Sequence, residues 1–243
     1  MGSSSAPPPA PTTGDRVIVL IALVLPTAVT WLYFIALQSA PAHFQQGAYG
    51  VGKTIQFALP LVWVLGVQRR FERPAIPPRW ALVAGALFGL AVAVVMAASY
   101  FGLLARSEVF AAPQQTVRAK IASFGIHSPL AYLALAVFYS AVHSLLEEYY
   151  WRWFVFGQLN QQTSRPLAIA ISSLGFAAHH VLVLALYFGW TSPLTWFFAL
   201  CVAVGGAVWA WLYGAAGSLA PTWLSHAIVD AAIFAIGYQM LPK

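Results

Sequence analysis

Several side chains that could carry out chemistry lie inside strongly apolar stretches of this 243-residue chain. The chain has only six Asp and Glu residues, and Glu147, Glu148 and Asp230 fall within such stretches. Ionised groups are costly in a lipid bilayer, so those that occur there usually face a protected interior and have a function. Two adjacent carboxylates are suited to general acid–base chemistry. We therefore expect the function to centre on the glutamate pair.

A spacing of four residues connects the polar groups around this pair. Glu148 and Arg152 are four residues apart, which places them on one face of a helix where they can form an ion pair. Glu147 is rotated by about 100° from Glu148 and shares a face with His143. For His143 and His179 we favour a structural role as interhelical hydrogen-bond partners.

The same spacing recurs in two later apolar stretches. Phe176 and His180 are four residues apart, and so are His226 and Asp230. At about 1.5 Å per helical residue, Glu147, His180 and His226 lie at comparable depths in their helices. Scattered packing contacts would not be expected to bring Glu, His and Asp together in this way, so we expect these residues to converge on one intramembrane cavity.

The composition excludes an ordinary soluble domain. Hydrophobic residues make up 60% of the chain and charged residues 7%, against about 25% charged in soluble domains. The net charge of +6 does not indicate a nucleic-acid partner, because the basic residues lie in short loops between apolar stretches, as membrane topology requires. The single cysteine, Cys201, excludes an internal disulfide and a Cys-pair metal site.

The elements that must position these groups are membrane-spanning helices. We expect an all-α polytopic membrane protein with a Pro- and Ser-rich disordered tail over residues 1–15 and a transmembrane domain over 16–243. Residues 105–128 favour an amphipathic interfacial helix, and the count would rise to eight if this segment entered the membrane. Seven spans are expected, at about 17–38, 51–67, 80–104, 129–157, 166–188, 191–213 and 218–240.

The arginines of one loop predict the orientation. Arg69, Arg70, Arg73 and Arg79 lie between the second and third spans, which favours a cytoplasmic loop and a cytoplasmic N-terminus. The residue usage is typical of a GC-rich bacterium, so we expect an integral protein of the bacterial inner membrane.

Residues Gly47–Thr54 match the phosphate-binding pattern GxxxxGK[ST]. That motif works as a loop between a buried strand and a helix, where its amides bind phosphates. Here it opens a membrane span and no strand precedes it. We interpret the match as a coincidence and expect no nucleotide partner.

Three ordered motifs resemble those of the CPBP family of intramembrane proteases, which includes the CAAX prenyl endopeptidases and the bacteriocin-processing and immunity-linked (Abi) proteins. They are Glu147-Glu148-x-x-x-Arg152, Phe176-x-x-x-His180 and His226-x-x-x-Asp230, and the resemblance covers about residues 129–240. The third motif often ends in Asn in this family, where this chain has Asp230.

The resemblance implies an endopeptidase that hydrolyses a peptide bond near the membrane. Glu147 would activate water with His180 beside it, and His226 and Asp230 would stabilise the oxyanion. Glu148 and Arg152 would hold Glu147 in place. The implied partners are the lipid bilayer and a membrane-associated protein or peptide, with either a CAAX-like sequence or a sorting signal.

The same residues are compatible with three alternatives to a metal-independent protease. Glu147, His180 and His226 resemble the ligand set of a zinc protease, although a metal-independent glutamate mechanism without a cofactor is favoured. Intramembrane Glu and His residues also relay protons in transporters, but neither inverted repeats nor broken helices are visible. A catalytically silent scaffold or immunity protein is a third alternative, which the complete motifs disfavour.

Overall fold

Every regular element in the described part of the protein is a helix. The computed structural model describes residues 10–70, 75–123, 126 and 128–239, so Arg73 of the basic loop lies outside it. The predicted all-α fold with seven spans is confirmed. The helices that are long and apolar enough to cross a membrane are Thr13–Ala36, Ala42–Val67, Arg79–Leu104, Pro129–Gln162, Arg165–Phe188, Pro193–Ala216 and Ala220–Tyr238.

Four of these spans combine α-helix with wider π-helical turns, whereas the last three are continuous α-helices. The first three spans are α1 (Thr13–Trp31) with η1 (Leu32–Ala36), α2 (Ala42–Leu61) with η2 (Val62–Val67), and α3 (Arg79–Ser99) with η3 (Tyr100–Leu104). The fourth span consists of α5 (Pro129–Val137), η4 (Phe138–His143), α6 (Ser144–Glu148), η5 (Tyr149–Phe156) and α7 (Gly157–Gln162). The last three are α8 (Arg165–Phe188), α9 (Pro193–Ala216) and α10 (Ala220–Tyr238).

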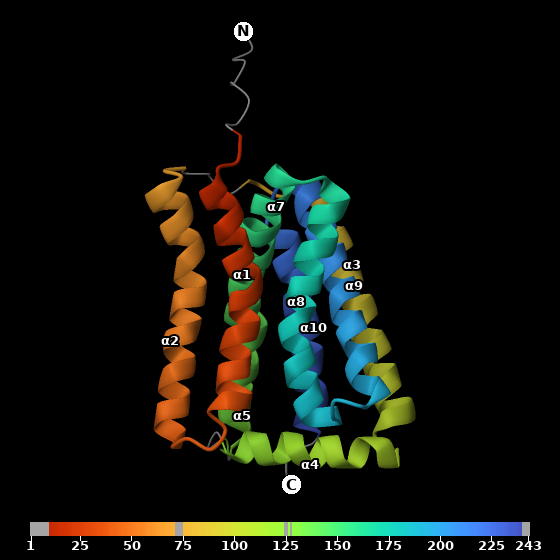
Figure 1. The fold of residues 1–243 in the computed structure, drawn as a ribbon. Helices are drawn as coiled ribbons and strands as arrows, with labels where there is room; N and C mark the ends of the chain where they lie inside the picture. Colours follow the sequence, from red (N-terminus) through yellow and green to blue (C-terminus); the bar gives the residue numbers. More distant parts are fainter. Residues whose placement is uncertain (1–9, 71–74, 124–125, 127, 240–243) are drawn as a thin grey trace.

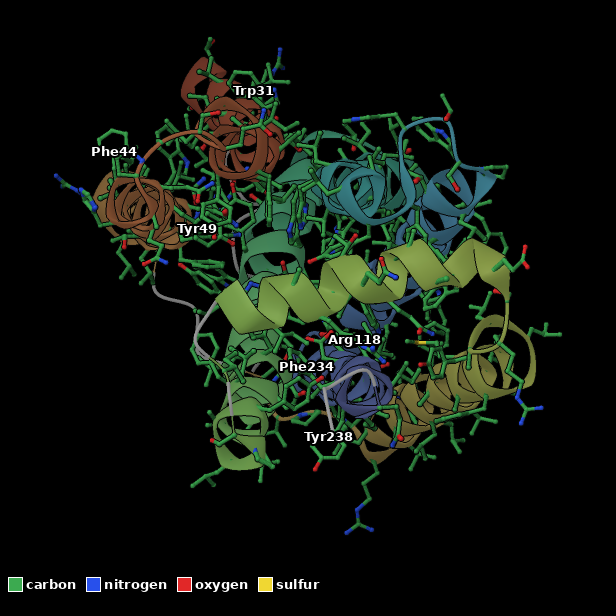
Figure 2. The ribbon with its side chains drawn as sticks, turned by 90° about the horizontal axis from the view of Figure 1, so that it is seen from below. Trp31, Phe44, Tyr49, Arg118, Phe234 and Tyr238 are labelled. Carbon is green, nitrogen blue, oxygen red and sulfur yellow. The ribbon has the colours of Figure 1, made fainter. Side chains whose placement is uncertain are left out.

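The spans run side by side, and α1 begins at the end of the bundle opposite to the one where α10 ends (Figure 1). Helix α4 (Glu108–Ser123) does not join them. It lies across the end of the bundle away from the N-terminus, as both views show (Figures 1 and 2). This is the arrangement predicted for an interfacial helix, so the segment does not add an eighth span.

Two segments are helical although their sequences suggest another conformation. Helix α1 begins at Thr13, where Thr12 and Asp15 form a capping box, so the prediction of a disordered tail up to residue 15 is wrong for residues 13–15. Residues 1–9 of that tail lie outside the described residues. Gly47–Thr54 forms part of the continuous helix α2, where its amides enter helical hydrogen bonds and form no phosphate-binding loop.

Two glycines let α3 approach α10 closely. A Cβ atom at Gly85 would clash with the carbonyl oxygen of Pro221, and one at Gly89 would lie 2.8 Å from the carbonyl oxygen of Ser225. Only glycine permits this backbone contact, which is the small-residue packing that membrane helices use. The contact fixes the part of α10 that carries His226.

The cluster of buried apolar side chains lies in the half of the bundle nearer the start of α1. Tyr150, Trp151 and Phe154 of η5 are almost completely buried and pack with Val19 and Ala22 of α1. The hydroxyl of Tyr150 donates a hydrogen bond to the carbonyl oxygen of Ala22 at 2.8 Å. This core anchors the fourth span immediately after the glutamate pair.

Candidate active site

The ion pair predicted between Glu148 and Arg152 is present and completely buried. Glu148 Oε1 lies 3.0 Å from Arg152 Nη1, and the two side chains are 0% and 2% exposed. The guanidinium group lies over the rings of Phe176 and Trp209, 4.5 and 5.0 Å from their centroids. Arg152 Nη2 also donates a hydrogen bond of 3.4 Å to the carbonyl oxygen of Gly206. These contacts connect the fourth span to α8 and α9.

His226 of α10 completes this arrangement. Its Nδ1 lies 2.8 Å from Glu148 Oε1, and its ring stacks on that of Trp209 at 4.3 Å and 17°. The Trp209 indole in turn donates to the hydroxyl of Ser225 at 2.9 Å. A carboxylate paired with arginine can only accept hydrogen bonds, so the geometry assigns the hydrogen to His226 Nδ1. His226 Nε2 is therefore the nitrogen that faces Glu147 and Asp230.

Glu147 lies on the opposite side of His226 and contacts three imidazole rings. Its carboxylate oxygens are 4.0 Å from His143 Nε2, 3.6 Å from His179 Nε2 and 3.7 Å from His226 Nε2. These histidines come from three different spans. Asp230 joins the group, because its Oδ1 lies 3.7 Å from His226 Nε2. The structure thus brings Glu147, Glu148, His226 and Asp230 together.

His180 and His179 do not occupy the positions that the motif suggests. His180 Nδ1 lies 2.9 Å from the carbonyl oxygen of Phe176, and its ring packs against that of His179 at 4.1 Å. Among the described residues, the ion pairs of Glu147 include His179 and not His180. His179, for which the sequence favours a structural role, lies nearest to Glu147 of the three histidines that contact this carboxylate.

Gly175, one helical turn before His179, is a sequence feature that could have indicated the position of His179. A Cβ atom at Gly175 would lie 3.0 Å from the ring of Trp151, so the face of α8 that carries Gly175 packs directly on the fourth span. His179 is four residues further along and shares that face. Its ring stacks parallel to Trp151 at 5.9 Å and 4°. The small residue Gly175 on the same face as His179 was therefore the signal in the sequence that this face packs against the fourth span.

The described residues do not fit a zinc site formed by Glu147, His180 and His226. No group of three or more His, Cys, Asp or Glu side chains in the described part of the chain is arranged to hold a metal ion. Glu147 and His226 meet, but His180 directs Nδ1 to a backbone carbonyl.

Access to the site differs between its two sides. Towards the N-terminal end of the bundle, Tyr150, Trp151 and Phe154 close it with exposed fractions of 0–1%. Towards the α4 end, the side chains of His143 and Asp230 keep exposed fractions of 19% and 16%. The group is therefore more accessible from the α4 side.

Residues 129–232 match the family model described as Type II CAAX prenyl endopeptidase Rce1-like. This region is Rce1-like. The match contains all three motifs and confirms the resemblance to the CPBP intramembrane proteases. No curated protein and no solved structure matches the chain.

The Rce1-like match supports a CAAX-type intramembrane endopeptidase in general. With the seven apolar helices, it supports an integral membrane protein that acts on a membrane-associated substrate. The Rce1-like region begins at α5, so α1, α2 and α3 lie outside the match although they pack against it.

Proposed function

We propose that the chain hydrolyses a peptide bond in a membrane-associated substrate, with a water molecule activated by Glu147. The observation that carries this proposal is the position of Glu147 itself. It is a buried carboxylate, 4% exposed, that faces three imidazoles and lies beside a neighbour already neutralised by Arg152. A carboxylate in this setting is suited to general base catalysis, which typically contributes about 10²–10⁴-fold to a rate.

In the proposed reaction, Glu147 removes a proton from water and the hydroxide oxygen attacks the carbonyl carbon of the scissile bond. His179 and His180 hold this water. Since His180 Nδ1–H donates to the Phe176 carbonyl oxygen, its Nε2 keeps a lone pair that can accept a hydrogen bond. When the tetrahedral intermediate collapses, Glu147 returns the proton to the leaving amine, so protons balance without a metal.

His226 is proposed to stabilise the oxyanion. Glu148 holds Nδ1, so an imidazolium at this position would direct Nε2–H towards the negative oxygen. Asp230 cannot donate a hydrogen bond to an oxyanion as a carboxylate. We therefore propose that Asp230 orients His226 Nε2, which it approaches at 3.7 Å. Glu148 and Arg152 hold His226 from the other side.

Cleavage of a membrane-tethered reporter in proteoliposomes tests the proposal. Glu147→Ala and His180→Ala should each abolish cleavage while expression and thermal unfolding stay close to wild type, and Glu147→Gln should behave in the same way. His179→Ala should also reduce cleavage strongly, because His179 lies nearest to Glu147. The exposed residues Glu108 and His43 give matched controls, Glu108→Gln and His43→Ala.

Undiminished processing by both Glu147→Ala and His180→Ala would end the protease proposal. Loss with His179→Ala but not with His180→Ala would assign the water-binding role to His179.

A further inference from the structure

A pocket lies at the end of the bundle where α1 begins, away from the candidate active site. Its volume is about 250 Å³, and it is lined by residues that follow η2, by the last turns of the fourth span and by the end of α9. Gln158, one of the lining residues, is roughly 16 Å further along the fourth span than Glu147, at 1.5 Å per residue. The buried rings of Tyr150, Trp151 and Phe154 lie between these two positions on the span. The pocket is therefore a separate feature of the fold.

One wall of the pocket carries a guanidinium group. Arg70 follows η2, and its backbone N–H donates a hydrogen bond of 3.0 Å to the carbonyl oxygen of Val64. The preceding residue, Arg69, has a positive φ of 53°, which is uncommon for a residue with a side chain. After this turn, Arg70 Nη1 donates a hydrogen bond of 3.1 Å to Gln161 Oε1 at the pocket. A guanidinium group has five donors, and no carboxylate of the described residues lies within 4.0 Å of Arg70, so its charge is available to a ligand.

The other walls offer hydrogen-bond acceptors and aromatic rings. The fourth span ends at Gln162 and α9 ends at Ala216, both next to residues that line the pocket. The last carbonyl groups of a helix lack intrahelical partners and carry a partial negative charge. The rings of Phe156 and Tyr213 meet edge to face at 6.0 Å, and Trp153 also lines the pocket. Because ring faces attract cations, these walls suit a positively charged group that donates hydrogen bonds.

The pocket also lies where the spans end, which is the level of lipid headgroups. Helix α7 marks this end of the bundle in Figure 1. Polar side chains replace apolar ones here, and Gln68 and Gln158 exchange two hydrogen bonds of 3.0 and 3.1 Å across the pocket lining. Basic pockets between membrane helices at this level bind lipid headgroups. A phospholipid can place its headgroup here while its acyl chains stay in the bilayer.

We propose that this pocket binds the headgroup of an ethanolamine phospholipid, with the phosphate on Arg70 and the primary ammonium group against the helix ends and aromatic rings. Arg70 and the phosphate form charge-assisted hydrogen bonds. The ammonium group has three donors for the carbonyl acceptors of the other walls. A choline headgroup has the same phosphate without these donors, and a glycerol headgroup has no positive charge. The bound lipid connects the ends of the second, fourth and sixth spans.

Native mass spectrometry of the full chain in detergent tests this, with phosphatidylethanolamine, phosphatidylcholine and phosphatidylglycerol of identical acyl chains as ligands. For the wild type we expect Kd to be about tenfold lower for the ethanolamine lipid than for the other two, as one charge-assisted hydrogen bond would give. Arg70→Met should raise the Kd of the ethanolamine lipid about tenfold. Arg70→Lys should keep most of the affinity, which shows that the loss follows the charge and not the folding of the variant. Arg79→Met, which removes the same charge at an exposed position, is the matched control.

Three results would overturn the inference. Equal Kd values for the ethanolamine lipid and either of the other lipids would contradict the ammonium subsite. Unchanged lipid binding by Arg70→Met would contradict the phosphate subsite. Displacement of the lipid by an equal concentration of free phosphoethanolamine would identify a soluble ligand in place of a lipid. Each of these results leaves Glu147-dependent cleavage intact, so the proposed function is tested separately.

Discussion

Replacing Arg152 by methionine would leave the carboxylate of Glu148 buried without its cationic partner. Glu148 is 0% exposed and would keep only His226 Nδ1 at 2.8 Å. Removing one partner of a buried ion pair costs about 3–5 kcal/mol, because the remaining charge is neither hydrated nor paired. The methionine side chain can still pack against the rings of Phe176 and Trp209, so the loss of stability reports mainly on the charge.

The double variant Glu148→Gln/Arg152→Met supplies the decisive comparison. It removes both charges, and the amide oxygen of Gln can still accept the hydrogen bond of His226 Nδ1. We expect its free energy of unfolding to fall by about 1–2 kcal/mol, less than for Arg152→Met alone, since neither of these two positions keeps a buried charge. The two single variants and the double variant form a cycle, and we expect a coupling energy of about 2 kcal/mol or more between the two sites.

The assay is equilibrium unfolding in detergent micelles followed by tryptophan fluorescence, for which the chain has ten tryptophans. Arg16→Met, at an exposed position, is the control, and its free energy of unfolding should stay within about 0.5 kcal/mol of that of the wild type. A loss below about 1 kcal/mol for Arg152→Met, as exposed ion pairs show, would refute the reasoning. Losses of the two single variants that add up to that of the double variant would refute it equally.

Two further predictions concern helix packing and metals. Gly89→Ala places a Cβ atom 2.8 Å from the Ser225 carbonyl oxygen and should push α10 away from α3, lowering kcat in the reporter assay by at least tenfold. Gly205→Ala, where a Cβ atom meets nothing within 4 Å, should leave kcat unchanged, and equal rates for the two variants would contradict the packing argument. Dialysis against a strong chelator should leave cleavage unaffected, as followed by reporter cleavage and elemental analysis. One tightly held zinc per chain, with activity lost on its removal, would show that the metal-independent mechanism is wrong.

The length and apolarity of the spans made the fold predictable. A run of about 20 apolar residues in a membrane has few alternatives to a spanning helix. The observed span boundaries differ from the predicted ones mainly where polar residues extend a helix. The second span is an example, because it begins at Ala42 rather than near residue 51. The ion pair of Glu148 and Arg152 was predictable for a related reason, since it depends on spacing within one helix.

Contacts between helices were harder to predict. The choice between His179 and His180 depends on how α8 is rotated against the fourth span, and a rotation of about 100° exchanges adjacent residues. The stacking of His226 on Trp209 likewise depends on how α9 and α10 pack after their tight turn. Gly217 allows that turn by adopting a positive φ of 65°.

The contact of α10 with the glycines of α3 has a consequence for the order of synthesis. The ribosome makes α3 early, and α10 only after α6 and α8 have been made. His226 lies on α10 next to Ser225, whose carbonyl oxygen faces Gly89. Until α10 is inserted against α3, Glu148 lacks the hydrogen bond of His226 Nδ1, and Glu147 lacks its third imidazole. The buried polar cluster is therefore completed only when the last of the seven described spans is in place.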